Sequence, residues 1–347
     1  MMQIDKLNQV EKLFESYRDT KGFSGVALMK TEQEELFHFC AGYENRAYKI
    51  ENKLSTAFDT ASITKLFTVA GIILLESKGL ISLEDDIHSI LDLQNTRIPK
   101  DVKIKHLLTH TSGIADDVEE EKGEDYSALF ANSANYALRE NIDFMPNFAN
   151  KVPNFKAGER ICYNNCAFIL LGLAIEKITN KGYRQFITEE IFPTFQLKNT
   201  FFTGKDDCDR RYAEGYYYDE SRNLRKNIYS FPPIGTADSG AYTTVGDLDI
   251  FIRNIKNSDV YQKMMCPQTS IRYERNDAYY TVGFGFELIE KDGKILRVHK
   301  DGHNNGVCNI TIFYPQEDIT FTILGNVECN IWELKSECEK ILFDKAF

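Results

Sequence analysis

The chain has 347 residues, of which 43% are hydrophobic and 12% aromatic, and its formal net charge is −11. This length allows a large core in one domain or two lobes, and an acidic chain without a basic run is a poor candidate for binding nucleic acid or an anionic membrane. No apolar run reaches the length of a membrane span, and no signal peptide is seen, so a cytoplasmic location is expected.

The N-terminal region is predicted to form a helix followed by two strands. An amphipathic helix is expected within residues 1–20, because apolar residues recur at helical spacing from Ile4 to Phe14. Residues 23–29 and 35–39 are predicted strands joined by a polar hairpin loop.

A buried helix is predicted over residues 66–78, with Asp59 and Thr60 as N-cap candidates. Ser62 then lies in its first turn and Lys65 lies three residues later on the same face, so the hydroxyl and the amine can meet. A buried amine with a lowered pKa can take the serine proton, and free N–H groups at the helix N-terminus can bind an oxyanion. The pattern suits serine acyl transfer, although S-x-x-K also arises often by chance in ordinary helix caps.

The middle of the chain is predicted to be mainly helical. The predicted helices cover residues 83–93, 104–113, 119–150, 168–178 and 186–192. Gly113 is expected to stop the second of these helices, and Pro193 to end the last one.

The C-terminal region returns to strands. Strands are predicted at residues 241–244, 281–288, 295–298, 307–314 and 319–324, and helices at residues 245–255 and 332–347. Strands at both ends of the chain predict an α+β fold, in which one antiparallel sheet from both chain ends is flanked by helices and carries a mainly helical insertion. The corresponding domains are residues 1–85 with 235–347 for the sheet and residues 86–234 for the helices, with the active site in the cleft between them.

Two further motifs fit a serine acyl-transfer site. Tyr163 can act as a proton relay beside a lysine, and Asn165 can bind both that lysine and a substrate carbonyl. Lys300 and Gly302 lie between two predicted strands. On an edge strand, this lysine supplies positive charge, and the glycine lets a substrate backbone approach.

With these motifs in order, the chain resembles the serine β-lactamase and penicillin-binding-protein superfamily, nearest its class C and esterase-like branch. The similarity extends over nearly the whole chain and implies a β-lactamase/transpeptidase-like fold. It rests on Ser62-x-x-Lys65, Tyr163-x-Asn165, Lys300-Asp301-Gly302, the signature at residues 107–113, and residues 239–244 with Asp247-Leu248.

The resemblance also implies roles for these residues. Ser62 would be the nucleophile, Lys65 and Tyr163 would share general base and acid duty, and Asn165 would orient Lys65 and the substrate amide. Lys300 would support the electrostatics. The oxyanion hole would be formed by the N–H groups of Ser62 and of the residue after the third motif, His303. No metal or cofactor is implied, and the expected partner is a small-molecule or short-peptide substrate.

Asp301 departs from the family pattern, because a hydroxyl residue usually stands there and helps to hold a substrate carboxylate. An anion at this position would repel that carboxylate and offset Lys300, so poor turnover of β-lactams and peptide carboxylates is predicted, and better activity on neutral esters or amine-bearing substrates. Alternatively, Asp301 points away and pairs with Lys300 or a nearby arginine. His299 is a second candidate for the lysine position, and no class A deacylation glutamate is recognisable.

Several further functions remain compatible with the sequence. A metal hydrolase would need the pair His106 and His110 or the pair His299 and His303, but neither has the H-E-x-x-H pattern, and no G-x-S-x-G motif indicates an α/β-hydrolase. A true β-lactamase or DD-peptidase also fits the three motifs, and so does a sensor or scaffold that does not turn over.

The eight cysteines are expected to be reduced thiols. The sequence leaves the oligomeric state open.

Overall fold

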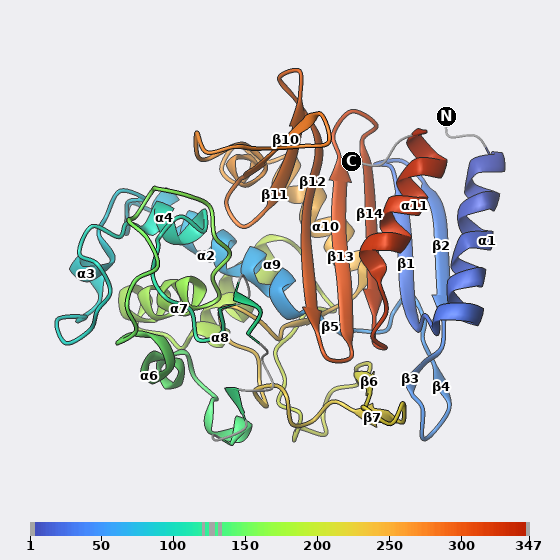
Figure 1. Ribbon diagram of the computed structural model, residues 1–347, viewed down its shortest axis with the longest axis horizontal. Helices are drawn as coiled ribbons and strands as arrows, with labels where there is room; N and C mark the ends of the chain where they lie inside the picture. Colours follow the sequence, from blue (N-terminus) through green and yellow to red (C-terminus); the bar gives the residue numbers. More distant parts are fainter. Residues whose placement is uncertain (1–3, 120–121, 125–128, 131–133, 345–347) are drawn as a thin grey trace.

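The computed structural model describes residues 4–119, 122–124, 129–130 and 134–344. Its centre is an eight-stranded antiparallel sheet in the order β2-β1-β14-β13-β12-β11-β10-β9 (Figure 1). The strands are β1 Gly25–Lys30, β2 Glu35–Ala41, β9 Tyr273–Arg275, β10 Ala278–Val282, β11 Glu287–Lys291, β12 Lys294–Asn304, β13 Val307–Tyr314 and β14 Ile319–Gly325. β1 pairs with β14, so the two chain ends meet in one sheet. The predicted α+β fold class is confirmed.

Helices cover both faces of this sheet. α1 (Ile4–Lys21) and α11 (Ile331–Phe343) lie side by side over one face (Figure 1), and α10 (Val245–Lys256) lies on the other. The strand period of two explains this layering, because alternate residues of β1 enter different cores. Ala27 belongs to the α1–α11 core, whereas Val26 belongs to the core that includes α10.

The helical part of the molecule is built on α2 and α7, which pack against each other. Their contact is close where α2 has no side chain, since a Cβ on Gly71 would come within 3.2 Å of Ile175. The helical elements here and near the sheet are η1 Ala61–Thr64, α2 Lys65–Ser77, α3 Ile87–Ile90, α4 Ile104–Leu108, η3 Asn135–Ala137, η4 Asn141–Phe144, α6 Met145–Phe148, α7 Cys166–Thr179, α8 Tyr183–Phe186, η5 Ile187–Ile191, α9 Phe192–Thr194 and η6 Gln262–Met265.

Three two-stranded pairs complete the part of the fold that the structure describes. They are β3 Tyr43–Asn45 with β4 Ile50–Glu51, β5 Phe58–Asp59 with β8 Tyr242–Thr243, and β6 Tyr216–Tyr218 with β7 Leu224–Lys226. The β5–β8 pair matters for the site, because β5 leads directly into η1 and α2.

Several predicted boundaries were wrong, and each has a local cause. The strand expected at 281–288 is two strands, since the chain turns at residues 283–286, where Gly285 has φ +76°. The helix expected at 104–113 ends at Leu108, because the chain leaves helical geometry and His110 takes a φ of +55°.

Two other helix predictions also need correction. The helix does not end before Pro193 but continues to Thr194, because Pro193 lies in the first turn of α9 (Phe192–Thr194), where no N–H from proline is needed. Residues 119–150 contain only short helical turns where they are described, and the remainder of that prediction lies outside the described residues, as do positions 1–3 and 345–347 of the terminal helices.

The third motif lies within a strand rather than between strands. β12 runs from Lys294 to Asn304 and is interior to the sheet, but its pairing with β11 ends at His299 opposite Glu287. Residues 300–304 therefore pair with β13 on one side only, which gives them a local edge within an interior strand.

No helix among the residues that the structure describes is both long and apolar enough to cross a bilayer.

Candidate active site

Ser62 lies in η1, the turn that immediately precedes α2, rather than in the first turn of the α-helix. This turn is anchored by its neighbours. Asp59 accepts a hydrogen bond from the Ala61 N–H at 2.8 Å, and the Thr60 hydroxyl donates to the carbonyl of Ala241 at 2.8 Å. Ala61 has a φ of +43°, which is unusual for a residue with a side chain. Local strain held by surrounding hydrogen bonds is a frequent property of functional turns.

Lys65 is fully buried, and its amine is surrounded by three acceptors. Its Nζ donates to Ser62 Oγ at 3.0 Å, to Asn165 Oδ1 at 2.7 Å and to the carbonyl of Asp238 at 2.9 Å. A lysine has three N–H donors when charged and keeps a lone pair when neutral, so a neutral Lys65 can accept a proton from Ser62.

Tyr163 contacts the same serine from the other side. Its hydroxyl donates to Ser62 Oγ at 2.6 Å, and its ring lies beside that of His110, with 4.7 Å between centroids. Burial is the main cause that lowers the pKa of His110 well below its usual value, with Lys300 and Lys65 adding to it. A neutral, buried ring thus supports the tyrosine.

Asn165 is held by a buried carboxylate that sequence reasoning missed. Asp116 accepts hydrogen bonds from the N–H groups of Asn165 at 2.8 Å and Cys166 at 2.9 Å, so it caps the start of α7. The same carboxylate lies 3.4 Å from the Asn165 Nδ2 atom, which leaves Asn165 Oδ1 to face Lys65. The only sequence signal is an acidic pair, Asp116 and Asp117, shortly after the signature at residues 107–113.

Asp116, Asp117 and Cys166 form the one cluster of metal-ligand type found in the described parts of the chain. Both Asp116 oxygens already accept backbone N–H groups, and Asp117 accepts the N–H of Val118. Burial raises the pKa of Asp117 and of the Cys166 thiol well above their usual values, which favours their protonated forms. Asp116 is therefore explained as the cap of α7, and the protonated forms of Asp117 and Cys166 do not suit metal binding.

Gly302 brings β12 against η1, the turn that carries Ser62 and is called the nucleophile turn below, after the role expected of Ser62. A Cβ on this residue would overlap the carbonyl oxygen of Thr60 and would lie 3.1 Å from the Ser62 nitrogen. The absence of a side chain is thus required by the close approach of two backbones. His303 follows on the same strand and lines the same hollow as Ser62.

Lys300, rather than His299, faces the other motifs. Its Nζ lies 4.7 Å from the centre of the Tyr163 ring, and its side chain is only 1% exposed. His299 is buried, and its Nε2 lies 3.7 Å from Glu287 Oε2. Burial is the main cause that lowers the pKa of His299 well below its usual value.

Lys300 is paired with two carboxylates. Its Nζ lies 3.2 Å from Glu287 Oε1 and 3.7 Å from Asp301 Oδ1. Asp301 also accepts a hydrogen bond from Trp332 Nε1 at 2.9 Å. Burial raises the pKa of Glu287, whereas Lys300 acts in the opposite direction. Glu287 gave no sequence signal, because only the β11–β12 register places it here.

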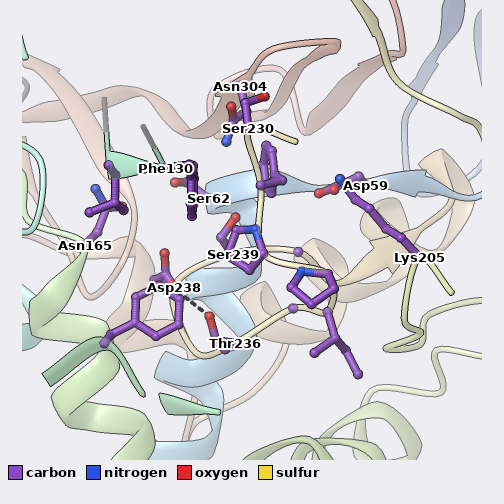
Figure 2. A pocket seen from close by; sticks show the side chains of 18 of the residues that line it. Asp59, Ser62, Phe130, Asn165, Lys205, Ser230, Thr236, Asp238, Ser239 and Asn304 are labelled. Carbon is purple, nitrogen blue, oxygen red and sulfur yellow. Dashed lines mark hydrogen bonds between the residues drawn. The ribbon is translucent and has the colours of Figure 1, made fainter. Parts of the chain in front are cut away.

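Two hollows meet at Ser62. Figure 2 shows the first, with Ser62 near its centre, Asn165 and Asp238 at one end and Asp59 with Lys205 at the other. Its walls include the apolar side chains Phe130, Phe144, Phe231, Pro232 and Ile234. The second hollow is lined by Ser62, Glu124, Tyr163, Tyr280, Glu287, Asp301, His303, Asn304, Asn305 and Trp332.

The chain is similar to known proteins over almost its whole length. A family model described as Beta-lactamase matches residues 10–335. Penicillin-binding protein 4* of Bacillus subtilis (strain 168) is 31% identical over 343 residues, covering 94% of this chain and 73% of that protein. The crystal structure of a penicillin-binding protein from Bacillus halodurans matches with a TM-score of 0.87 and 30% identity, over 96% of this chain and 99% of that one.

An octameric penicillin-binding protein homologue from Pyrococcus abyssi shares the fold, with a TM-score of 0.82 and 21% identity over 98% of this chain and 78% of that one. The match of the family model across almost the whole sequence, together with the shared sheet and helices, shows that the chain belongs to the beta-lactamase family, within the superfamily of serine β-lactamases and penicillin-binding proteins.

Proposed function

We propose that this protein is a serine hydrolase that forms an acyl-enzyme on Ser62 and acts on small esters or amides, including peptides with a D-residue. The observation that carries the proposal is the position of Ser62 Oγ. It lies 3.0 Å from Lys65 Nζ and 2.6 Å from the Tyr163 hydroxyl, at the junction of two hollows. A nucleophile in contact with both a base and a proton relay is the arrangement that acyl transfer needs.

In the first half of the reaction, the Lys65–Tyr163 pair takes the Ser62 proton as Oγ attacks the substrate carbonyl carbon. A new Oγ–C bond forms, and the carbonyl electron pair moves to oxygen, where the N–H groups of Ser62 and His303 would stabilise it. The carbonyl then re-forms and the bond to the leaving group breaks. Tyr163 returns the proton to the leaving oxygen or nitrogen.

In the second half, water attacks the acyl carbon and gives its proton to the same pair. The bond between Ser62 Oγ and the acyl group breaks, and the proton returns to the serine. Asn165 supports both halves, because its Oδ1 holds Lys65 in place and its buried position fixes the amide.

Covalent labelling tests this proposal directly. A fluorophosphonate probe should label the native protein at Ser62, as found by mass spectrometry of the digested adduct, and should not label Ser62→Ala. Ser230→Ala is the matched control, because its hydroxyl lines the same hollow but bonds Asn227 rather than Lys65. Equal labelling of native protein and Ser62→Ala would overturn the assignment.

A β-lactamase or DD-peptidase is the second candidate, and the 31% identity to a penicillin-binding protein favours it. Hydrolysis of nitrocefin at ordinary enzyme efficiency would support this candidate over esters. Burst kinetics with a chromogenic ester distinguish an enzyme from a sensor that is acylated but does not turn over. The sensor releases one equivalent of product and stops, whereas the enzyme continues.

A further inference from the structure

The cation of the third motif is already neutralised in this protein. Lys300 is 1% exposed, and its Nζ lies 3.2 Å from Glu287 and 3.7 Å from Asp301. One lysine thus faces two carboxylates. A substrate carboxylate that approached Lys300 would either sit beside two anions or displace Glu287, which would leave a largely buried carboxylate without its partner. Both arrangements are unfavourable.

Asp301 is fixed in this position rather than free to turn away. Its Oδ2 accepts the indole N–H of Trp332 at 2.9 Å, while its Oδ1 faces Lys300. Since both oxygens have partners, the carboxylate remains on the wall of the second hollow. The sequence-based alternative, in which Asp301 points away and pairs with Lys300 or a nearby arginine, holds only for the pairing with Lys300, because the carboxylate contacts Lys300 and Trp332 and stays on the wall of the hollow.

The rest of the second hollow suits a cation. Its described lining contains the carboxylates Glu124, Glu287 and Asp301 and the rings of Tyr163, Tyr280 and Trp332, with neither a lysine nor an arginine among these wall residues. Carboxylates accept hydrogen bonds from an ammonium group, and aromatic faces attract it. The hollow opens on Ser62, so a group bound there belongs to the molecule that Ser62 attacks.

We propose that Asp301 and Glu287 are specificity-determining residues that select substrates carrying an ammonium group, and that reject substrates carrying a carboxylate at the same place. This inference rests on the proposed function, because it assigns a substrate class to the same nucleophile. The ammonium group would lie in the second hollow, beside Glu287, Asp301 and the aromatic rings that line it, while the reacting carbonyl is at Ser62.

The test uses three phosphonofluoridate probes that differ only at the end of the linker. One ends in a primary ammonium, one in an isosteric methyl group and one in a carboxylate, each made with two, four and six methylenes. Second-order rate constants for labelling of Ser62 are measured at pH 7 and 0.15 M salt, where long-range attraction to the acidic protein is screened. Labelling requires that Ser62 attacks the probe but does not require turnover. The labelling rate therefore measures the reactivity of Ser62, whatever the rate of deacylation.

The ammonium probe is expected to react fastest at its best linker length. Its labelling rate constant should exceed that of the carboxylate probe at least about fivefold. A factor of this size corresponds to the interaction of one pair of charges about 4 Å apart in bulk water. Asp301→Asn and Glu287→Gln should each reduce this ratio. Asp301→Asn keeps an oxygen that can accept from Trp332. The matched control is Asp277→Asn, which removes one exposed carboxylate in the β9–β10 turn, outside the lining of the hollow.

The outcomes separate this inference from the proposed function. Labelling of Ser62 with equal rates, or with a preference for the carboxylate probe, overturns the inference and leaves the nucleophile standing. A cation preference that survives in both variants overturns the assignment to these two residues. No labelling by any probe overturns the proposed function and this inference together.

Discussion

The Gly302→Ala substitution probes how the backbone of β12 holds the nucleophile turn. An added Cβ would overlap the Thr60 carbonyl oxygen and lie 3.1 Å from Ser62 N and 3.2 Å from Ile63 N. All three atoms belong to the backbone, so no flexible side chain can move aside. Restoring van der Waals contact requires that β12 and η1 separate by about 1 Å.

Two effects of that separation can be estimated. Overpacking of a buried contact costs about 1–3 kcal/mol in the free energy of unfolding. A shift of about 1 Å between Ser62 and the strand that carries His303 should slow acylation about 100-fold, because the attacking oxygen and the oxyanion donors lose their alignment. The loss of reactivity should therefore exceed what partial unfolding would cause.

The assay measures the labelling rate of Ser62 by the neutral phosphonate probe, with urea unfolding on the same sample. Gly182→Ala is the matched control, because Gly182 has an ordinary φ of −60° and no atom within 4 Å of an added Cβ. It should label and unfold like the native protein. Labelling of Gly302→Ala at the native rate would refute the view that this glycine sets the distance between strand and turn.

Three further predictions concern the proton path, the buried histidines and the cysteines. Lys65→Ala and Tyr163→Phe should each lower turnover of a p-nitrophenyl ester about 100-fold or more, and the double variant should lose little more, because the two residues share one proton path; additive losses would contradict this. Burial is the main cause that lowers the pKa of His110 and of His299 in the folded protein, so both rings resist protonation there. The free energy of unfolding should therefore fall as the pH drops below about 6.5, by up to about 2.7 kcal/mol per pH unit for the two groups together. Urea unfolding at pH 7.5 and 5.5 checks this, and His299→Gln should show about half the slope. Titration of the unfolded, unreduced protein with a thiol reagent should find nearly all eight cysteines, and fewer would indicate disulfides.

The fold class was predictable because it depends on patterns that repeat along the chain. β2 alternates buried and exposed residues and α11 has an apolar face, whereas β1 and α7 are continuous apolar runs whose lengths suit a strand and a helix. Strands at both ends with helices between leave few arrangements other than one sheet built from the two ends. The points where elements end were harder to predict, because the turn at Gly285 and the positive φ of His110 each depend on one residue.

The predicted site residues Ser62, Lys65, Tyr163 and Asn165 lie together, since short motifs with fixed spacing carry their own local geometry. Glu287 and Asp116 could not be found in this way. Glu287 reaches Lys300 only because β11 and β12 pair with Glu287 opposite His299, and Asp116 reaches Asn165 across about fifty residues of chain. A residue whose role depends on tertiary register leaves no periodic signal in a single sequence.

In the proposed function and the further inference, this difference also separates the residues that would carry out the chemistry from those that would select a substrate. The nucleophile turn is held by the hydrogen bonds of the Thr60 N–H and hydroxyl to the Ala241 carbonyl and by the close approach of the Gly302 backbone. The charges at positions 287 and 301 lie on side chains of β11 and β12 that do not hold this turn. The substrate class can therefore change through two side chains while the positions of Ser62 and Lys65 stay the same.

If this separation holds, the double variant Glu287→Gln with Asp301→Asn should label with the neutral probe at close to the native rate while losing its preference for a cation. A large loss with the neutral probe would show that the two carboxylates, through Lys300 and the Tyr163 ring, belong to the machinery that positions the nucleophile.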